Sequence, residues 1–196
     1  MTIRKGLKVL SKVLLLACVL IYMLFLVGHY VLKAQTNKQA EMDNEVAQGI
    51  AATQRDDTAE ALKWYLKAAD QGDATAEIAL GALYNNGQGV PNDYTEAARW
   101  YRKAADQGEA HAQYYLGLSY SKGQGVPQDY VQAYMWLNLA SATFEMAGRS
   151  TAMRYKTPEN EEFGREVRRA RDSVEALMTP AQIKGAQQLT SSWKPK

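Results

Sequence analysis

The strongest constraint on the fold is a long segment that occurs twice in the sequence. Residues 59–94 and 95–130 are identical at 22 of 36 aligned positions without a gap. A third copy starts directly afterwards, so that Trp64, Trp100 and Trp136 recur every 36 residues. Self-similarity at a period of roughly 20 to 50 residues is typical of solenoids, in which each unit buries its apolar face against the next. The sequence therefore predicts a stack of similar units.

Each unit is expected to form two helices. In the second copy, a first helix near residues 95–106 and a second near 110–121 are separated by Gly108, which can adopt the left-handed conformation that ends a helix. Both helices carry apolar residues at the spacing of one buried helical face. These residues are Ala97, Trp100, Tyr101, Ala104, Ala105, Ala112, Leu116 and Tyr120. The predicted fold class is all-α: a short α-solenoid of helix-turn-helix repeats with a 36-residue period.

A glycine-rich phrase closes each unit, as NNGQGVPNDY at residues 85–94 and SKGQGVPQDY at 121–130. A phosphate-binding loop would continue with Lys and Ser or Thr at a helix start, but here Val-Pro-x-Asp-Tyr follows. Pro91 and Pro127 each remove an amide donor and fix φ, which suits a rigid turn better than an anion site. We therefore expect connectors between helices, with glycines in positive-φ conformations at positions 87, 89, 123 and 125.

The repeated pattern reads A-x-x-W-Y-x-K-A-A-x-Q-G, then A-x-x-x-L-G-x-x-Y, then G-x-G-V-P-x-D-Y. This pattern resembles the Sel-one-like repeat, a relative of the tetratricopeptide repeat, over residues 59–142. The resemblance implies a curved α-solenoid that acts as an adaptor for other proteins, and many bacterial members are exported. Some exported members carry a cysteine pair in each repeat, and a few bind or hydrolyse β-lactams. The repeats here hold no cysteine, so the resemblance disfavours that subclass.

A long apolar segment precedes the repeats. Residues 13–32 contain no Asp, Glu, Lys or Arg. Twenty helical residues span roughly 30 Å, the thickness of the hydrocarbon core of a bilayer, so we predict a transmembrane signal-anchor. Two alternatives stay open: a cleaved signal peptide, with export of the remainder, and a lipoprotein signal with Cys18 as the lipidated residue.

The cations that flank this segment indicate its orientation. Arg4, Lys5, Lys8 and Lys12 precede it, whereas only Lys33 and Lys38 follow closely. By the positive-inside rule, the N-terminus lies in the cytoplasm and residues 33–196 lie on the far side. In a bacterium this predicts a single-pass protein of the inner membrane with its repeats in the periplasm.

Both ends of the repeat stack need cover, because terminal units would otherwise expose an apolar face. Before the repeats, Met42, Val46 and Ile50 are spaced for a capping helix. After them, Thr157-Pro158 and Thr179-Pro180 have the signature of two helix starts. The predicted organisation is a basic N-terminus (1–12), the span (13–32), a linker and capping helix (33–57), repeat 1 (58–94), repeat 2 (95–130), a degenerate repeat 3 (131–156) and C-terminal capping helices (157–196).

The inventory of catalytic residues after the span is thin. His111 is the only histidine after residue 32, and the only cysteine lies in the span, so neither a His/Cys metal site nor a Cys–His pair can form. Residues 33–142 carry nine Lys and Arg against fourteen Asp and Glu, which is no electrostatic footprint for nucleic acid. We predict no enzyme, no cofactor and no nucleic-acid partner, and an ordinary surface or groove position for His111.

Positions that differ between units are free to serve a ligand. The resemblance to tetratricopeptide stacks implies that the first helices line a concave groove, so their exposed variable positions are candidates for a partner-binding site. These residues are Lys63, Leu66, Lys67, Arg99, Arg102, Lys103, Met135 and Asn138. Their positive charge favours an acidic or carboxylate-bearing protein or peptide. The predicted function is a membrane-tethered scaffold or adaptor; the alternatives are a binder or modulator of peptidoglycan or cell-wall enzymes and, less favoured, an enzyme.

Overall fold

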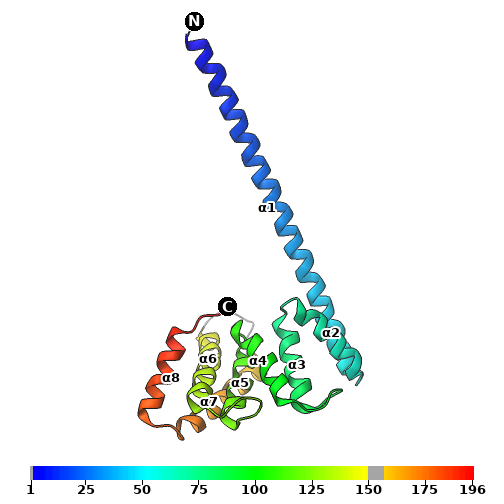
Figure 1. Cartoon of the computed structure of the whole chain (residues 1–196), viewed down its shortest axis with the longest axis vertical. Coiled ribbons are helices and arrows are strands. Elements are labelled where there is room, and N and C mark those ends of the chain that lie inside the picture. Colours follow the sequence, from blue (N-terminus) through cyan, green and yellow to red (C-terminus); the bar gives the residue numbers. More distant parts are fainter. Residues whose placement is uncertain (1, 150–156) are drawn as a thin grey trace. The chain divides into compact units, whose positions relative to one another are not determined.

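A computed structural model describes the backbone of residues 2–149 and 157–196, and the side chains of residues 22–145 and 157–196. The described chain folds into helices joined by turns, as predicted for an all-α solenoid (Figure 1). The helices are α1 (Thr2–Gln54), α2 (Thr58–Asp70), α3 (Ala74–Asn86), α4 (Tyr94–Asp106), α5 (Ala110–Lys122), α6 (Tyr130–Arg149), α7 (Pro158–Glu175) and α8 (Pro180–Ser192).

The chain divides into two compact units, Met1–Asn44 and Glu45–Lys196. The first is the N-terminal part of α1, and its described apolar side chains, such as Leu24 and Tyr30, are exposed. The predicted span falls partly on residues 13–21, whose side chains lie outside the described residues. In the part of the chain that the structure describes, no helix has both the length and the apolar character needed to cross a bilayer.

The second unit begins with the last part of α1, which differs from the capping helix predicted for this region. Ile50 is 44% exposed, so its predicted burial is wrong, whereas Glu45, Val46, Gly49 and Ala52 are buried. The physical reason is that residues 41–54 repeat the pattern of a second helix. Glu45 and Gly49 stand four residues apart, as Glu77 and Gly81 do in α3. The array therefore starts with half a repeat.

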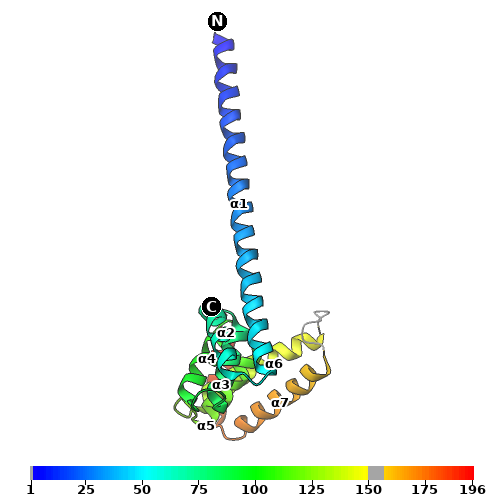
Figure 2. The same ribbon diagram turned by 90° about the vertical axis from the view of Figure 1, so that its right-hand side faces the viewer.

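Each helix from α2 to α6 packs against the next along the chain, which is the solenoid arrangement (Figures 1 and 2). Each interface from a second helix to the following first helix uses the same contact: a glycine makes room for a large side chain 16 or 20 residues later. A Cβ on any of these glycines would lie within 2.7 Å of that side chain. The pairs are Gly49 with Tyr65, Gly81 with Tyr101, and Gly117 with Leu137.

Alanines at fixed positions of the first helices let the neighbouring helices approach closely. Ala68, Ala104 and Ala140 recur every 36 residues, and all three are fully buried. Leu80 and Leu116 on the second helices are fully buried as well. The repeated sequence pattern therefore corresponds to one repeated packing scheme.

The glycine-rich phrases are connectors, as predicted. Gly87 and Gly123 end α3 and α5 in the left-handed conformation, with φ of 67° and 68°. The backbone N–H of Asp93 donates to the carbonyl of Tyr84 at 3.0 Å and closes the turn. The Asp93 carboxylate then accepts the N–H groups of Thr95 and Glu96 and so caps the start of α4.

The C-terminal part closes the array. α6 is a continuous helix of 20 residues, even where its sequence departs from the repeat pattern. Residues 150–156 lie outside the described residues. α7 and α8 both pack against α6 (Figure 1). Thr157 and Thr179 cap the two helices as predicted, and Thr179 forms a capping box with Gln182.

Candidate functional site

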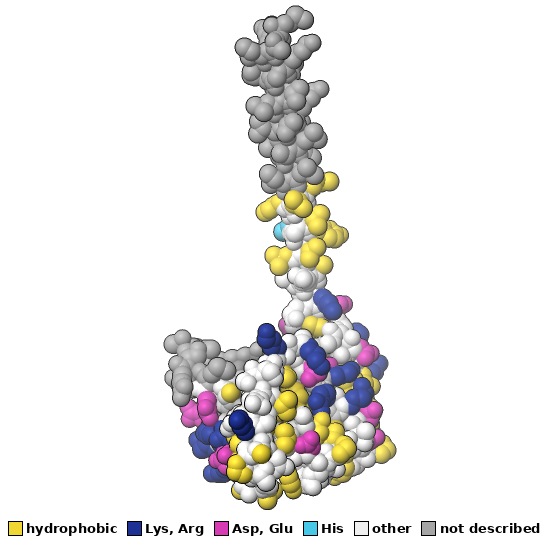
Figure 3. Space-filling model, turned by 60° about the vertical axis from the view of Figure 1, so that its left-hand side comes forward, with side chains coloured by type: hydrophobic (Ala, Val, Ile, Leu, Met, Phe, Trp, Pro, Cys, Tyr) yellow, Lys and Arg dark blue, Asp and Glu magenta, His cyan; other side chains and the backbone are white. Residues whose placement is uncertain are grey.

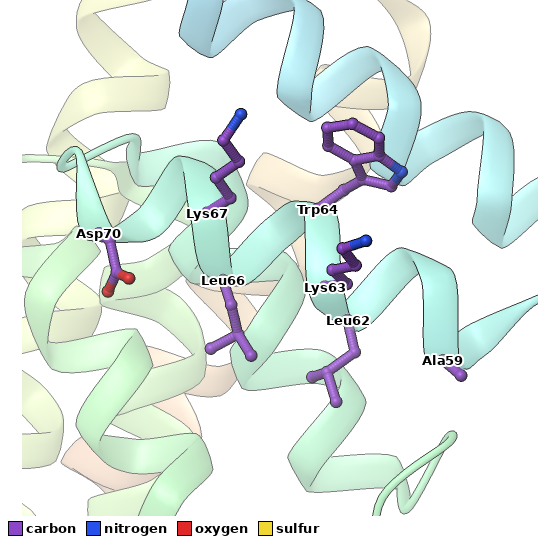
Figure 4. Close-up of a pocket in the computed structure, with 7 residues that line it drawn as sticks. All are labelled: Ala59, Leu62, Lys63, Trp64, Leu66, Lys67 and Asp70. Carbon is purple, nitrogen blue, oxygen red and sulfur yellow. The ribbon is translucent and has the colours of Figure 1, made fainter.

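An open groove of about 680 Å³ runs along the exposed side of α2. All the residues that line it come from this helix: Ala59, Leu62, Lys63, Trp64, Leu66, Lys67 and Asp70 (Figure 4). Leu62 and Leu66 point to one side of the helix, whereas Trp64 and Lys67 point to the other (Figure 4). Three predicted binding residues, Lys63, Leu66 and Lys67, are therefore brought together.

The groove combines an apolar surface with charged side chains. Leu62 and Leu66 are half-buried because they also pack against the core of repeat 1. Lys63 and Asp70 are exposed. Such a surface suits an extended peptide with apolar side chains and charges at defined positions.

Lys67 is held by a buried carboxylate that the sequence analysis did not single out. Its Nζ lies 2.8 Å from Oε1 of Glu45 and 5.7 Å from the ring of Trp64. The Gln71 side chain donates to the other oxygen of Glu45 at 2.7 Å. Because Glu45 is only 2% exposed, this ion pair fixes the end of α1 on α2 as well as the direction of Lys67.

The same device recurs one repeat later. Gln107 donates to Glu77 at 2.9 Å, and Lys103 lies close enough to Glu77 to favour its charged form. Burial is the larger effect, so the pKa of Glu77 is raised above its usual value. The Glu-x-x-x-Gly spacing shared by residues 45–49 and 77–81 was the sequence signal for this carboxylate.

On α4, the predicted cations lie against aromatic rings. The guanidinium of Arg99 lies 4.3 Å from the ring centroid of Trp100 and is paired with Glu96 at 2.7 Å. The ammonium of Lys103 lies 4.2 Å from the same ring. Both side chains are exposed, so they remain accessible to a ligand although they also stabilise the helix surface.

The remaining predicted residues are less accessible. Arg102 is half-buried, donates a hydrogen bond to the hydroxyl of Tyr120 and lies over the rings of Tyr120 and Trp136. Asn138 is half-buried. Met135 is 6% exposed and belongs to the core, so its predicted exposure is wrong. The reason is that Met135 packs into the buried cluster of α4 and α5 residues, against which Trp193 also packs.

Lys and Arg side chains gather on one area of the face shown in Figure 3, with Asp and Glu side chains beside them. This mixture agrees with the ion pairs described above. The surface carries positive charge at specific points rather than as one uniform basic patch.

His111 is half-buried, and its ring packs against the C-terminal part of the chain. Its ring stacks on Phe163 of α7 with centroids 4.5 Å apart and meets the edge of Phe144 at 5.7 Å. Burial lowers the pKa of His111, although Glu109 acts in the opposite direction. The ring of His111 therefore helps to hold α7 against α5 of repeat 2. Among the described residues, no group of three or more His, Cys, Asp or Glu side chains could hold a metal ion.

After α8, the segment 193–196 returns to repeat 2 (Figure 1). The backbone N–H of Lys196 donates to the carbonyl of Asp106 at 2.8 Å, and its Nζ lies 2.7 Å from the Asp106 carboxylate. The ring of Trp193 meets that of Trp136 at 6.0 Å with an edge-to-face angle of 76°. A segment of the chain itself therefore occupies a site at the end of α4.

Comparison with known proteins gives a match to the family model of the Sel1 repeat over residues 47–73, 74–109 and 110–142. The first matched segment includes the end of α1, in agreement with the half repeat seen in the structure. No curated protein matches the chain.

Two solved structures are similar. A protective antigen of uropathogenic Escherichia coli strains, which displays an SLR fold, is 29% identical, with a TM-score of 0.63 over 82% of this chain and 31% of that one. A Sel1 repeat protein from Oxalobacter formigenes is 33% identical, with a TM-score of 0.47 over 60% of this chain and 54% of that one. The chain thus spans about a third to a half of the length of these relatives. Residues 47–142 are thus similar to the Sel1 repeat family, and the repeated packing of the helices in this range agrees with that likeness.

Proposed function

We propose that the chain is a membrane-tethered adaptor that binds an envelope protein or peptide through the groove on α2. Sel1 repeat proteins generally mediate protein–protein interaction. The observation that carries the proposal is the groove itself, where the half-buried Leu62 and Leu66 lie on the same helix as the exposed Lys63 and Asp70. Partner carboxylates would pair with Lys63, with Arg99 and Lys103 on the next first helix as further cations.

The tether in this proposal is the apolar segment at residues 13–32, with the N-terminus in the cytoplasm and the repeats in the periplasm. The sequence supports it through the length of the uncharged segment and the four cations that precede it. Alkaline phosphatase fused after Lys196 should be active, and a cytoplasmic fluorescent reporter at the same position should be dark. The reverse result would place the repeats in the cytoplasm and exclude an envelope partner.

Photo-crosslinking in cells tests the groove. With a photoreactive residue at Ala59, which is exposed and lines the groove, we expect a discrete adduct with another protein. The same residue at Ala181, an exposed alanine on α8, should give none. Lys63→Glu should reduce the adduct from position 59 by reversing the charge beside it, whereas Lys184→Glu should not.

Equal adducts from positions 59 and 181 would mean that the groove is not the contact surface. Insensitivity to Lys63→Glu would show that its charge does not select the partner. Cosedimentation of the full chain with purified peptidoglycan separates protein binding from direct binding to the cell wall.

A further inference from the structure

The end of α4 and the end of α2 are the same structural element, but only the end of α4 is occupied by another segment of the chain that the structure describes. Residues 104–108 and residues 68–72 both read Ala-Ala-Asp-Gln-Gly. We call Asp106–Gly108 the repeat-2 corner and Asp70–Gly72 the repeat-1 corner. Gly108 and Gly72 have φ of 96° and 92°, so the two turns have the same backbone conformation.

The repeat-2 corner binds the segment 193–196 through three groups. Asp106 accepts the ammonium and the backbone N–H of Lys196. A Cβ on Gly108 would lie 3.6 Å from Pro195 and 3.9 Å from Trp193, so both side chains lie over the glycine. The Trp193 ring also meets Trp136 on the following first helix.

Each of these groups has a counterpart at the repeat-1 corner. Asp70 is exposed, and among the described residues its carboxylate has no hydrogen bond or ion pair. A Cβ on Gly72 would meet nothing within 4 Å. Trp100 belongs to the same buried cluster as Ala68 and Ala69, as Trp136 belongs to that of Ala104 and Ala105.

The surroundings of the two tryptophans differ in charge. Arg99 and Lys103 lie over Trp100, whereas the equivalent positions beside Trp136 are Met135 and Leu139. Because Trp100 is only 4% exposed, an aromatic ring that arrives at the repeat-1 corner would meet the exposed Arg99 and Lys103, which lie over the indole. The groove on α2 ends at Asp70, so the corner and the groove form one continuous surface.

From this duplication we propose that the repeat-1 corner binds an extended partner segment of the same chemistry as residues 193–196: an aromatic residue, one intervening residue, and then Pro and Lys. The partner's lysine pairs with Asp70, its proline lies on Gly72, and its aromatic ring lies toward Trp100. The partner residues that precede the aromatic residue extend away from this corner. The inference rests on the proposed function and adds the recognition sequence of the partner.

The probe is a synthetic peptide with the sequence of residues 187–196, labelled at its N-terminus. Its binding to the full chain in detergent micelles is followed by fluorescence anisotropy. We expect one peptide to bind per chain, and Asp70→Asn to weaken binding at least about ten-fold, because a hydrogen bond to a charged group is lost. Replacing the tryptophan by alanine or the final lysine by glutamine in the peptide should weaken binding similarly.

Asp56→Asn is the matched control, since it removes one exposed carboxylate beside the start of α2 and should leave binding unchanged. Asp70 is exposed, so its replacement does not threaten folding. No binding, or equal binding by wild type and Asp70→Asn, would overturn the proposal. A loss of binding in Asp106→Asn but not in Asp70→Asn would also overturn it, because the peptide would then be displacing the chain's own segment at repeat 2.

The two proposals fail separately. If position 59 captures a protein in cells but the peptide does not bind, the adaptor function stands and the recognition sequence is wrong. If the peptide binds at Asp70 but position 59 captures nothing, the corner is a binding site and the cellular role proposed for the groove is wrong.

Discussion

Repeat 1 and repeat 2 share most of their sequence, yet they use their first helices differently. On α4, Arg102 contacts Tyr120 and Trp136, and Asp106 holds Lys196. On α2, the equivalent positions are Leu66 and Asp70, which line an open groove. The difference teaches that substituted positions such as Leu66 and Arg102 change the surface of a repeat, and that even an identical residue, Asp70 or Asp106, can stay open or hold a distant part of the chain.

The largest expected effect comes from exchanging the buried polar residue of the second helices. Repeat 1 has Glu77 there, and repeat 2 has the buried Gln113. Gln113→Glu places a carboxylate opposite Leu139 rather than a lysine, so we expect a loss of about 3 kcal/mol at neutral pH. Guanidinium unfolding of the full chain in detergent, followed by tryptophan fluorescence, measures this loss.

The loss should shrink at acidic pH, since the protonated acid is neutral and burial raises the pKa of such a group. Adding Leu139→Lys to Gln113→Glu should recover part of the stability, as Lys103 supports Glu77 in repeat 1. If Gln113→Glu cost nothing at any pH, the two positions would not be equivalent environments.

A smaller effect is expected where a glycine contacts a large side chain. In Gly81→Ala, the new Cβ would lie 2.5 Å from the ring of Tyr101, so we expect a loss of about 1–3 kcal/mol in the same unfolding assay. Gly185→Ala in α8 is the control: its Cβ would meet nothing within 4 Å, and alanine should stabilise the helix by up to about 1 kcal/mol. Equal effects at the two glycines would mean that close packing does not require Gly81.

The residues that cap the first helices should differ less between the two repeats in their contribution to stability. Asp93 accepts two backbone N–H groups at the start of α4, whereas Asp57 accepts one at the start of α2. Asp93→Ala should therefore cost about 1 kcal/mol and Asp57→Ala less, measured by urea unfolding. A larger cost at Asp57 would indicate that the start of α2 depends on its cap more than the geometry shows.

The smallest effect concerns His111, whose counterpart in repeat 1 is the exposed Thr75. Burial lowers the pKa of His111 in the folded chain, so the unfolded chain binds the proton more readily. The contribution of His111 to the free energy of unfolding is present above the pKa of the unfolded imidazole, about 6.5. It is lost as the pH falls through the lower pKa of the folded chain.

His111→Phe keeps a ring against Phe163 and removes this titration, so its unfolding free energy should fall less between pH 7.5 and pH 5.5 than that of the wild type. Parallel curves for the two chains would mean that another group causes the pH dependence.

The stack could be predicted from the sequence because its contacts recur at one interval. Gly81, Leu80 and Ala104 occupy positions that sequence repetition alone identifies. The half repeat at residues 45–54 was missed because the connection that follows it is short, which shifts Glu45 and Gly49 out of the 36-residue register.

The candidate site was predicted less completely, since exposure depends on which helices cover a position. The spacing of Met135 matches that of Lys63, yet Met135 packs into the cluster of α4 and α5 residues and is buried. The link between Lys196 and Asp106 crosses 90 residues and has no periodic signal.

The constant interval also determines how such a chain can change its length. A further copy of residues 74–109 inserted after Glu109 would bring its own glycine contact, aspartate cap and Gln–Glu hydrogen bond. Every older interface would keep its partner, and the array would gain one more first helix with its own set of variable positions. Gene duplication can therefore enlarge the recognition surface in whole steps, without any redesign of the interior.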